Sequence, residues 1–403
     1  MEIVNSIFDH IGSSKIAQKI EEEHSIAEKD VLKQGRLTTL KKQGSLARQT
    51  NSFLLTKNYL FYLSDEIEKK DDIVYFKSKG KIELEWIHNH FFIKTEKSSQ
   101  KERYFFKLFK NQKMIKFEVK NLLEYESWRQ LIVSLTINNT FFNDFKVISV
   151  IGRGSSAKVY EVRDKKTFNQ YACKCFKKKN LKENSLALLI NEIRILKRLQ
   201  GHPNILQFIS LFESENSVYL ITELCLGGRI TKKKMIYSNF ELSHIAKTLI
   251  HAVDYMSDNS IVHRDLKPDN ILLKYKDMSI EQNEIKIIDF GLAVDINRER
   301  EDKRIMGTIG YMAPELFINI FTLSSKIDIY SIGVILYNAL TGTKLFADKD
   351  SKQMILNNKD GKVDFDLNTF KIGDNDSKLN SKSRYYKNAR ERYVKTNRTY
   401  STV

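Results

Sequence analysis

The stretch that decides the fold of this chain is Val262-His263-Arg264-Asp265-Leu266-Lys267-Pro268-Asp269-Asn270. It places close together an acid, Asp265, a lysine, Lys267, and a side-chain amide, Asn270. A strand-like run from Ile285 to Ile288 follows and delivers a second carboxylate at Asp289. The segment and the run that follows it therefore gather two carboxylates, an ammonium group and a side-chain amide in a short stretch of chain.

A glycine-rich run lies upstream of this stretch. A strand expected from Phe145 to Ile151 leads into Gly152-Arg153-Gly154-Ser155-Ser156-Ala157-Lys158-Val159, where glycines allow backbone amides to approach phosphate groups. In the next expected strand, Tyr171-Ala172-Cys173-Lys174, side-chain alternation turns Ala172 and Lys174 toward one face.

An amphipathic helix is expected after that strand. Apolar residues recur at helical spacing between Ser185 and Gly201, and Glu192 stands beside this stripe as the candidate partner of Lys174. A further apolar strand from Val218 to Thr222 runs into Glu223-Leu224-Cys225. We expect the Cys225 thiol to pack at a core or rim position.

Together these motifs resemble the eukaryotic-type serine/threonine protein kinases, and most closely their calcium/calmodulin-dependent-like group. The resemblance covers residues 145–370 and implies an α+β, bilobal fold with a β-rich small lobe and a mostly helical large lobe. It implies that Asp265 accepts the proton of a substrate hydroxyl and that Lys267 neutralises charge on the transferred phosphoryl group. Lys174, oriented by Glu192, would meet the α and β phosphates.

ATP and Mg²⁺ are the cofactors that the resemblance implies. Asn270 and Asp289 would bind the metal. The other expected ATP-binding residues lie in the glycine-rich loop, the following strand and the adenine-binding hinge: Ile151, Gly152, Arg153, Gly154, Ser155, Ser156, Ala157, Lys158, Val159, Ala172, Lys174, Thr222, Glu223 and Cys225.

The segment after Asp289 has no residue that could take an activating phosphate. Leu292 to Met306 contains no Ser, Thr or Tyr, but it contains Glu299, Glu301 and Asp302. We expect one of these carboxylates to pair with Arg264 and to order the loop without phosphorylation.

The end of the large lobe departs from the family pattern. Beyond Phe370 the sequence is polar and basic, so we expect an incomplete large lobe followed by a basic polar tail, 371–403. Without closing helices, the helix after Asp328 is expected to expose apolar side chains, namely Ile329, Ile332, Val334, Ile335, Leu336 and Leu340.

The N-terminal third of the chain carries none of these kinase-like motifs. Residues 1–34 form an extension whose scattered aliphatic residues suit a helix. Residues 35–136 resemble a pleckstrin-homology domain, a β-barrel capped by a helix, on the hairpin from Phe53 to Tyr62 and on Trp128 in the last helix. The alternative is an unrelated small β domain with a buried tryptophan.

A lipid-binding role for this region is not favoured by its sequence. The pleckstrin-homology pattern has an arginine before its second strand, where this chain has Asn51 and Ser52. The remaining basic candidates are Lys41, Lys42, Arg48 and Lys57. A weak contact with a phosphoinositide or a membrane surface is therefore only an alternative.

Charge and composition limit the remaining choices. The net charge of +17 suits an anionic partner, but no aromatic-interleaved basic platform predicts nucleic-acid binding. Three cysteines without paired spacing, and no signal peptide or transmembrane segment, favour a cytoplasmic protein, peripheral at membranes if the lipid alternative holds.

The leading interpretation is a kinase acting on Ser or Thr of protein substrates. The alternative is a catalytically weak ATP-binding scaffold, a pseudokinase-like adaptor whose N-terminal domain binds lipid or protein. The sequence predicts no oligomeric state.

Overall fold

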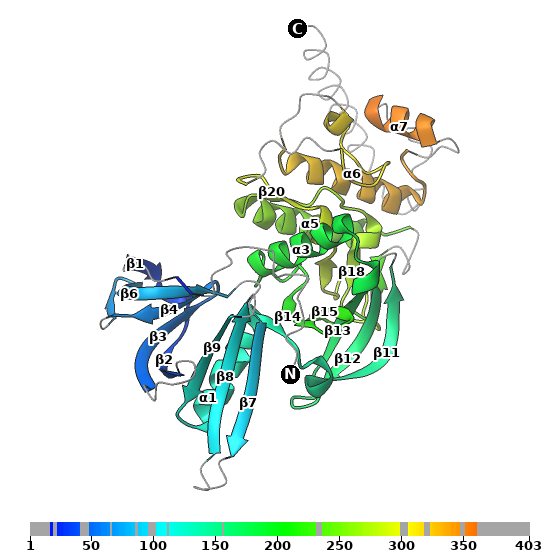
Figure 1. Cartoon of the computed structure of the whole chain (residues 1–403). Helices are drawn as coiled ribbons and strands as arrows, with labels where there is room; N and C mark the ends of the chain where they lie inside the picture. The colour runs from blue at the N-terminus through cyan, green and yellow to red at the C-terminus, as the bar shows by residue number, and fades with distance from the viewer. Residues whose placement is uncertain are drawn as a thin grey trace.

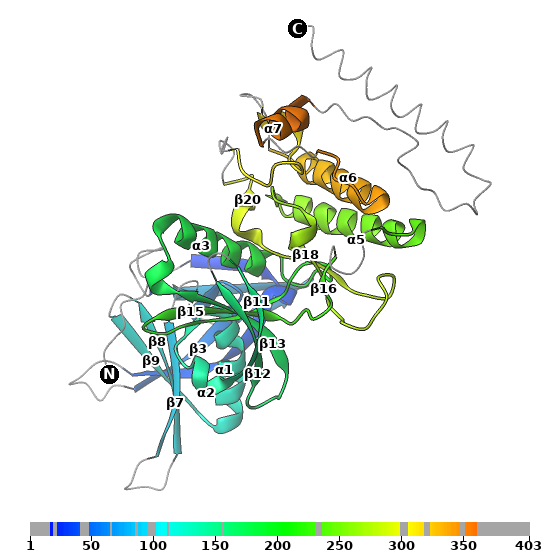
Figure 2. The same cartoon turned by 90° about the vertical axis from the view of Figure 1, so that its right-hand side faces the viewer.

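The computed structural model describes residues 17–18, 22–40, 48–64, 67–84, 88–95, 102–110, 113–154, 157–230, 236–298, 305–317, 323–346 and 351–360. Figure 1 shows an N-terminal group of strands, a second group of strands beside it and a helical part beyond the second group. In Figure 2, turned by 90°, the helices α5, α6 and α7 again lie at the opposite end of the molecule from β7, β8 and β9.

The N-terminal strands are antiparallel and pair in the order β1-β6-β4-β3-β2-β9-β8-β7, with β5 paired to β6. In β6, alternate side chains are buried, as expected for a strand with one face on a core. The elements are β1 (Glu22–Ala27), η1 (Glu28–Asp30), β2 (Val31–Leu40), β3 (Arg48–Thr56), β4 (Tyr59–Leu63), β5 (Glu68–Lys70), β6 (Ile73–Glu83), β7 (His88–Thr95), β8 (Glu102–Lys110) and β9 (Lys113–Val119).

The helix expected before residue 35 is wrong for the part that the structure describes. Glu22–Ala27 forms β1, which pairs along its whole length with β6. Val31 already belongs to β2. The aliphatic spacing suited a helix, but pairing with β6, about 50 residues away in the chain, decides the backbone conformation. The local spacing of apolar residues carries no information about such a distant partner. Ile16 and Ile20 lie outside the described residues.

The helix α1 (Leu122–Leu135) closes this region, and its tryptophan is buried as expected. The Asn121 side chain accepts the amide of Glu124 and caps the first turn. Trp128 is 1 % exposed and lies against β2, where a Cβ added to Gly35 would meet its ring at 3.1 Å. Among the described residues the strands form an open sheet, so the expected barrel stays a prediction.

A two-residue strand, β10 (Ile137–Asn138), joins the N-terminal strands to the second group. It runs parallel to β7 on one side and to β14 on the other. The second group pairs in the order β14-β15-β13-β12-β11. Its elements are α2 (Phe141–Asp144), β11 (Phe145–Arg153), β12 (Lys158–Asp164), β13 (Gln170–Lys177), η2 (Lys178–Asn180), α3 (Glu183–Arg198), β14 (Phe208–Glu213) and β15 (Ser217–Glu223).

The helical part is built on α5 (Asn239–Asp258), α6 (Lys326–Thr341) and α7 (Ser351–Asp360). A capping box between Ser238 and Glu241 starts α5. Short strands and single turns of 3-10 helix lie between the helices: β16 (Gly228–Arg229), β17 (Ile261–Val262), η3 (Pro268–Asn270), β18 (Ile271–Leu273), β19 (Ile285–Ile287), η4 (Phe290–Leu292), β20 (Val294–Asp295) and η5 (Pro314–Phe317). No helix within the described ranges is both long and apolar enough to cross a membrane.

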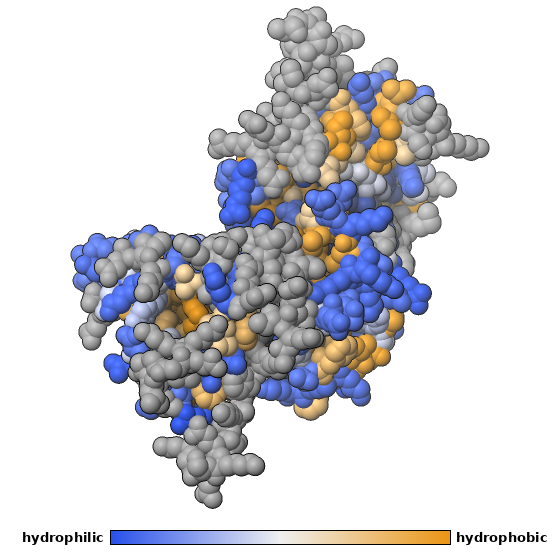
Figure 3. All heavy atoms as spheres, in the orientation of Figure 1, coloured by the Kyte–Doolittle hydropathy of each residue, from blue (hydrophilic) through white to orange (hydrophobic). Residues whose placement is uncertain are grey.

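The expected exposure of α6 is wrong for half of the residues named for it. Ile332, Val334 and Ile335 are each 2 % exposed, because α6 packs against α5 and its inward face joins the main core. Leu336 and Leu340 are half-buried, and Ile329 is exposed. Figure 3 shows apolar side chains at the surface near α7.

Candidate active site

An ion pair is formed between the strand β13 and the helix α3. Lys174 on β13 places its Nζ 2.8 Å from both carboxylate oxygens of Glu192 on α3. Burial alone would lower the pKa of Lys174, but the carboxylates of Glu192 and Asp289 outweigh it and raise that pKa. The ammonium is therefore held charged and fixed in direction.

Cross-strand register places the glycine-rich loop beside Lys174. Gly152 on β11 faces Val159 on β12, and Val159 faces Lys174 on β13. The amide of Gly154 donates to the carbonyl of Ala157 at 2.8 Å, so the loop folds back on itself. Ile151, Arg153 and Lys158 are exposed, whereas Ala157 is buried; Ser155 and Ser156 lie outside the described residues.

The segment expected to bind adenine lies at the end of β15. Thr222 is buried opposite Ala172 of β13. The carboxylate of Glu223 turns away toward Lys286, at 3.1 Å, and accepts the amide of Gln207, so this carboxylate is already engaged within the protein. Burial raises the pKa of the Cys225 thiol to about 12, which supports a packing role for this side chain.

Three side chains converge on the carboxylate of Asp265. Asp265 Oδ2 accepts Lys267 Nζ at 2.7 Å and Asn270 Nδ2 at 3.1 Å. Asp265 Oδ1 accepts the hydroxyl of Thr308 at 2.6 Å, and Lys267 Nζ also donates to that hydroxyl oxygen at 2.6 Å. Asp265 is only 8 % exposed, so these contacts fix the direction of its oxygens.

A buried acid on α6 holds the backbone of this loop. Asp328 accepts the amides of His263 at 2.7 Å and Arg264 at 3.0 Å, and it is fully buried. Arg264 has φ of 65°, a left-handed conformation that a non-glycine residue keeps only under external constraint. Asp328 therefore stabilises the backbone turn that presents Asp265.

The Asp289 segment is packed under α3. Phe290 is fully buried, and its ring lies 4.8 Å from that of the buried His263. Asp289 has φ of 66°, and its Oδ1 lies 4.0 Å from Lys174 Nζ. Asn191 on α3 donates to the carbonyls of Phe290 at 3.4 Å, Gly291 at 3.0 Å and Ala293 at 2.7 Å. The helix that carries Glu192 thus also holds the turn that presents Asp289.

These residues fit ATP and Mg²⁺. The carboxylate of Asp289 is half exposed, and the Asn270 amide uses its nitrogen on Asp265, which leaves its oxygen as the donor atom for a metal. The charged Lys174 stands beside both the glycine-rich loop and Asp289. At the hinge, the amide and carbonyl of Cys225 have no hydrogen-bond partner among the described residues.

Sequence reasoning missed four residues that shape the site. Thr308 lies in 307–315 and Asp328 in 328–333, two segments that resemble the kinase substrate-docking loop and the helix beneath it, so both positions had a signal in the sequence. Asn191, next to Glu192, had none. The side chain of Asn358 on α7 accepts the amide of Gly310 at 2.8 Å and donates to the carbonyl of Met312 at 2.7 Å. Asn358 lies close to the point where the sequence departs from the family pattern.

The family model for the protein kinase domain matches residues 145–392. This match covers more than half of the chain, and it continues past Phe370 into the tail that we expected to lie outside the domain. Residues 361–403 lie outside the described residues.

The chain is also similar to calcium-dependent and calcium/calmodulin-dependent kinases. It is 37 % identical over 259 residues to calcium-dependent protein kinase 4 of Plasmodium falciparum, covering 62 % of this chain and 48 % of that protein. It is 35 % identical over 237 residues to calcium/calmodulin-dependent protein kinase type 1 of Caenorhabditis elegans, covering 57 % and 65 %. To calcium-dependent protein kinase 33 of Arabidopsis thaliana it is 35 % identical over 220 residues, covering 54 % and 41 %.

The chain therefore spans about half the length of the first of these relatives. The match from residue 145 onward coincides with β11, the first strand of the group that carries Lys174, and it includes every residue of the site described above. On this evidence the chain belongs to the protein kinase domain family.

Proposed function

We propose that this chain is a serine/threonine protein kinase, which transfers the γ-phosphoryl group of Mg-ATP to a Ser or Thr hydroxyl of a protein. One observation carries the proposal: the Lys174–Glu192 pair is formed while Asp265 is held by Lys267, Thr308 and Asn270. Bound ATP would supply the phosphoryl group, and Mg²⁺ would neutralise its negative charge. The Lys174–Glu192 pair and the contacts around Asp265 are therefore formed at the same time.

Each residue then has a defined task. Asp265 would accept the proton of the attacking hydroxyl, and Lys267 would stabilise negative charge that develops beside it. Lys174 would hold the α and β phosphates, with Glu192 fixing its direction. Asn270 and Asp289 would hold the metal, and the residues of the glycine-rich loop and hinge would bind the rest of the nucleotide.

The non-enzymatic alternative is an ATP-binding scaffold. It rests on the sequence beyond Phe370, but the buried α6 and the contacts of Asn358 support a formed substrate-side loop. Incubation of the purified chain with Mg-ATP and a mixture of Ser- and Thr-containing peptides separates the two: peptide phosphorylation supports the enzyme, whereas nucleotide binding without transfer supports the scaffold.

For the N-terminal region we propose a pleckstrin-homology-like domain. Support comes from the antiparallel order of β2, β3, β4 and β6, the pairing of β9 with β2, and the closing helix α1 with its buried Trp128. The proposed domain spans residues 35–136, with β1 added at its edge, and the kinase domain begins at 145.

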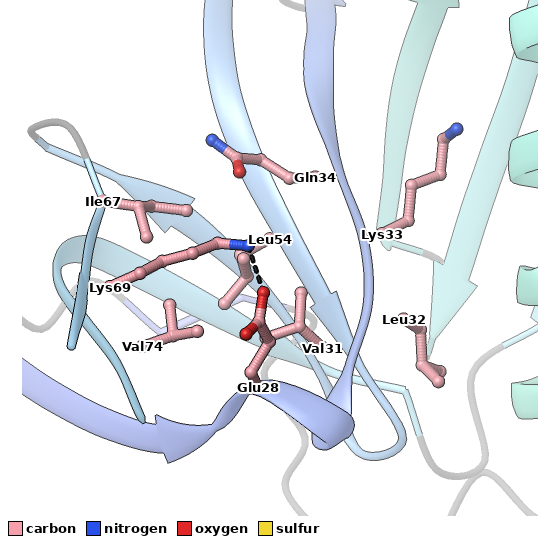
Figure 4. A pocket seen from close by; sticks show the side chains of 9 residues that line it. All are labelled: Glu28, Val31, Leu32, Lys33, Gln34, Leu54, Ile67, Lys69 and Val74. Carbon is pink, nitrogen blue, oxygen red and sulfur yellow. Dashed lines mark hydrogen bonds and ion pairs between the residues drawn. The ribbon is translucent and has the colours of Figure 1, made fainter. Parts of the chain in front are cut away.

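A pocket of about 260 Å³ in this region does not support lipid binding. Figure 4 shows its lining residues: Glu28, Val31, Leu32, Lys33, Gln34, Leu54, Ile67, Lys69 and Val74. Lys69 pairs with Glu28, and Lys33 donates to Ser127 at 2.8 Å. Lys41 and Lys42 lie outside the described residues, as does the side chain of Arg48; Lys57 is exposed. We propose that the domain contacts protein rather than phosphoinositide.

Kinase activity is expected without phosphorylation of the segment from Leu292 to Met306. The described part of this segment is already anchored, because Asp295 pairs with Arg198 of α3 and Arg264 Nε donates to the carbonyl of Leu292 at 2.7 Å. Glu299, Glu301 and Asp302 lie outside the described residues, so their pairing with Arg264 stays a prediction. Phosphatase treatment should leave kcat unchanged. Turnover that appears only after an upstream kinase acts would contradict this.

Neutral or acidic substrates are expected to be better than basic ones. Arg229 Nη1 lies 2.5 Å from Asp269 Oδ1, and both side chains are about half exposed near the catalytic loop. Because Arg229 neutralises Asp269, a basic substrate side chain meets no free acid there. Arg229→Glu should raise kcat/KM for an arginine-containing peptide about fivefold, the upper end of one exposed ion pair. Lys247→Glu, on the exposed face of α5, is the control. A wild-type preference for peptides with arginine upstream of the Ser or Thr acceptor would contradict this prediction.

A further inference from the structure

The segment that joins the N-terminal domain to the kinase domain is buried. Thr136 is 0 % exposed, and Ile137 and Asn138 are each 1 % exposed. Ile137 and Asn138 form β10, which pairs in parallel with β7 on one side and β14 on the other. A flexible tether would be exposed to solvent and unpaired. The junction is therefore part of the folded interior.

Polar contacts from α1 reinforce this junction. Arg129 Nη2 lies 2.7 Å from Asp144 Oδ1 of α2. The Asn138 amide donates to the carbonyl of Val133 on α1 at 3.0 Å and, at 3.4 Å, to that of Leu211 on β14. Since these groups are buried or half-buried, losing either partner would leave a polar atom unpaired. The N-terminal domain and the small lobe are thus held in one orientation.

One contact reaches the helix that carries the catalytic glutamate. Lys197 on α3 donates from Nζ to the carbonyl of Leu135 at 3.0 Å, and Leu135 is the last residue of α1. Carbonyls at a helix C-terminus lack partners within the helix and carry partial negative charge, so they favour a lysine ammonium. Lys197 follows Glu192 on the same helix, and Ile137 shares the core cluster of Ile193 and Leu196.

We propose that the N-terminal domain is a fixed part of the catalytic unit, and that Lys197 is the positioning residue through which α1 holds α3 where Glu192 meets Lys174. The helix α3 is then held by Leu135 through Lys197 as well as by Lys174 through Glu192. The effect on turnover rests on the kinase activity proposed above, whereas the effect on α3 itself does not.

The first test compares Lys197→Met, Lys197→Arg and the control Lys179→Met in the full chain; Lys179 is exposed on the same lobe. Lys197→Met should lower kcat/KM for ATP about tenfold, within the usual range of coupling between sites. Lys197→Arg should restore most of the activity, and Lys179→Met should match wild type. Wild-type kinetics in Lys197→Met would overturn the proposal.

The second test asks whether Lys197 acts through Glu192. In a Glu192→Gln background the Lys197→Met change should cause little further loss, because the pair that it positions is already broken. A structural role alone would give losses that multiply, and that result would also overturn the proposal.

The third measurement needs no activity. Hydrogen exchange of the α3 amides, Glu183–Arg198, should be faster in Lys197→Met than in wild type, with α5 unchanged. Unchanged exchange in α3 rejects the proposal even if the chain transfers no phosphate. Absence of turnover in the wild type, with the exchange difference present, would count against the kinase activity alone.

Discussion

Asp265→Asn is expected to lower kcat for phosphoryl transfer by about 10²–10⁴-fold, the usual contribution of a positioned general base. The amide keeps the size of the carboxylate but cannot take up the hydroxyl proton. It also removes the negative charge that Lys267 contacts at 2.7 Å. Affinity for Mg-ATP should change little, because Lys174 and Asp289 are untouched. Titration calorimetry with Mg-ATP and a peptide phosphorylation assay measure the two quantities on the same preparation.

The control for this variant is Asp254→Asn, an exposed acid on α5. It should leave both kcat and nucleotide affinity at wild-type values. If Asp265→Asn kept wild-type turnover, the assignment of the general base would be wrong. If it lost nucleotide binding as well, the two halves of the site would not be separable in the way the geometry indicates.

Asp289→Asn is expected to abolish turnover for a different reason. Its carboxylate is half exposed and 4.0 Å from Lys174 Nζ, so the substitution removes a metal ligand while disturbing little packing. A ligand that binds only the folded state raises the unfolding temperature. We expect Mg-ATP to raise that temperature in wild type, and the magnesium-dependent part of the rise to disappear in Asp289→Asn.

Thermal unfolding with ATP alone, with magnesium alone and with both separates the contributions. ATP without metal should stabilise wild type and Asp289→Asn equally. A full magnesium-dependent rise in the variant would show that the metal is held elsewhere, and wild-type turnover in it would contradict the role of Asp289.

The sequence could predict those parts of the site whose geometry follows from the local chain. Asp265, Lys267 and Asn270 are fixed in one loop by their spacing, and strand alternation turned Ala172 and Lys174 to one face. The apolar stripe of α3 determined which side of the helix carries Glu192. These are short-range regularities, so one sequence is enough to find them.

The contacts that the sequence pattern could not predict join residues that are far apart in the chain. Asp328 reaches the catalytic loop from α6, and Asn191 meets the carbonyls after Asp289 across about 100 residues of sequence. The same limit explains why the helix predicted before residue 35 is wrong, since Glu22–Ala27 pairs with β6 as a strand. It also explains why the predicted exposure of the apolar side chains of α6 is wrong for half of them. Whether a side chain is buried depends on the segment that packs against it, and the spacing of apolar residues does not identify that segment.

The most direct test of the central claim is single-turnover phosphoryl transfer by the purified full chain, with labelled ATP and magnesium. The account predicts labelled Ser or Thr, on the protein itself or on an added peptide, that requires magnesium and is absent in Asp265→Asn. Wild-type chain that binds Mg-ATP, unfolds cooperatively and yet transfers no label would contradict it and leave the nucleotide-binding scaffold as the function.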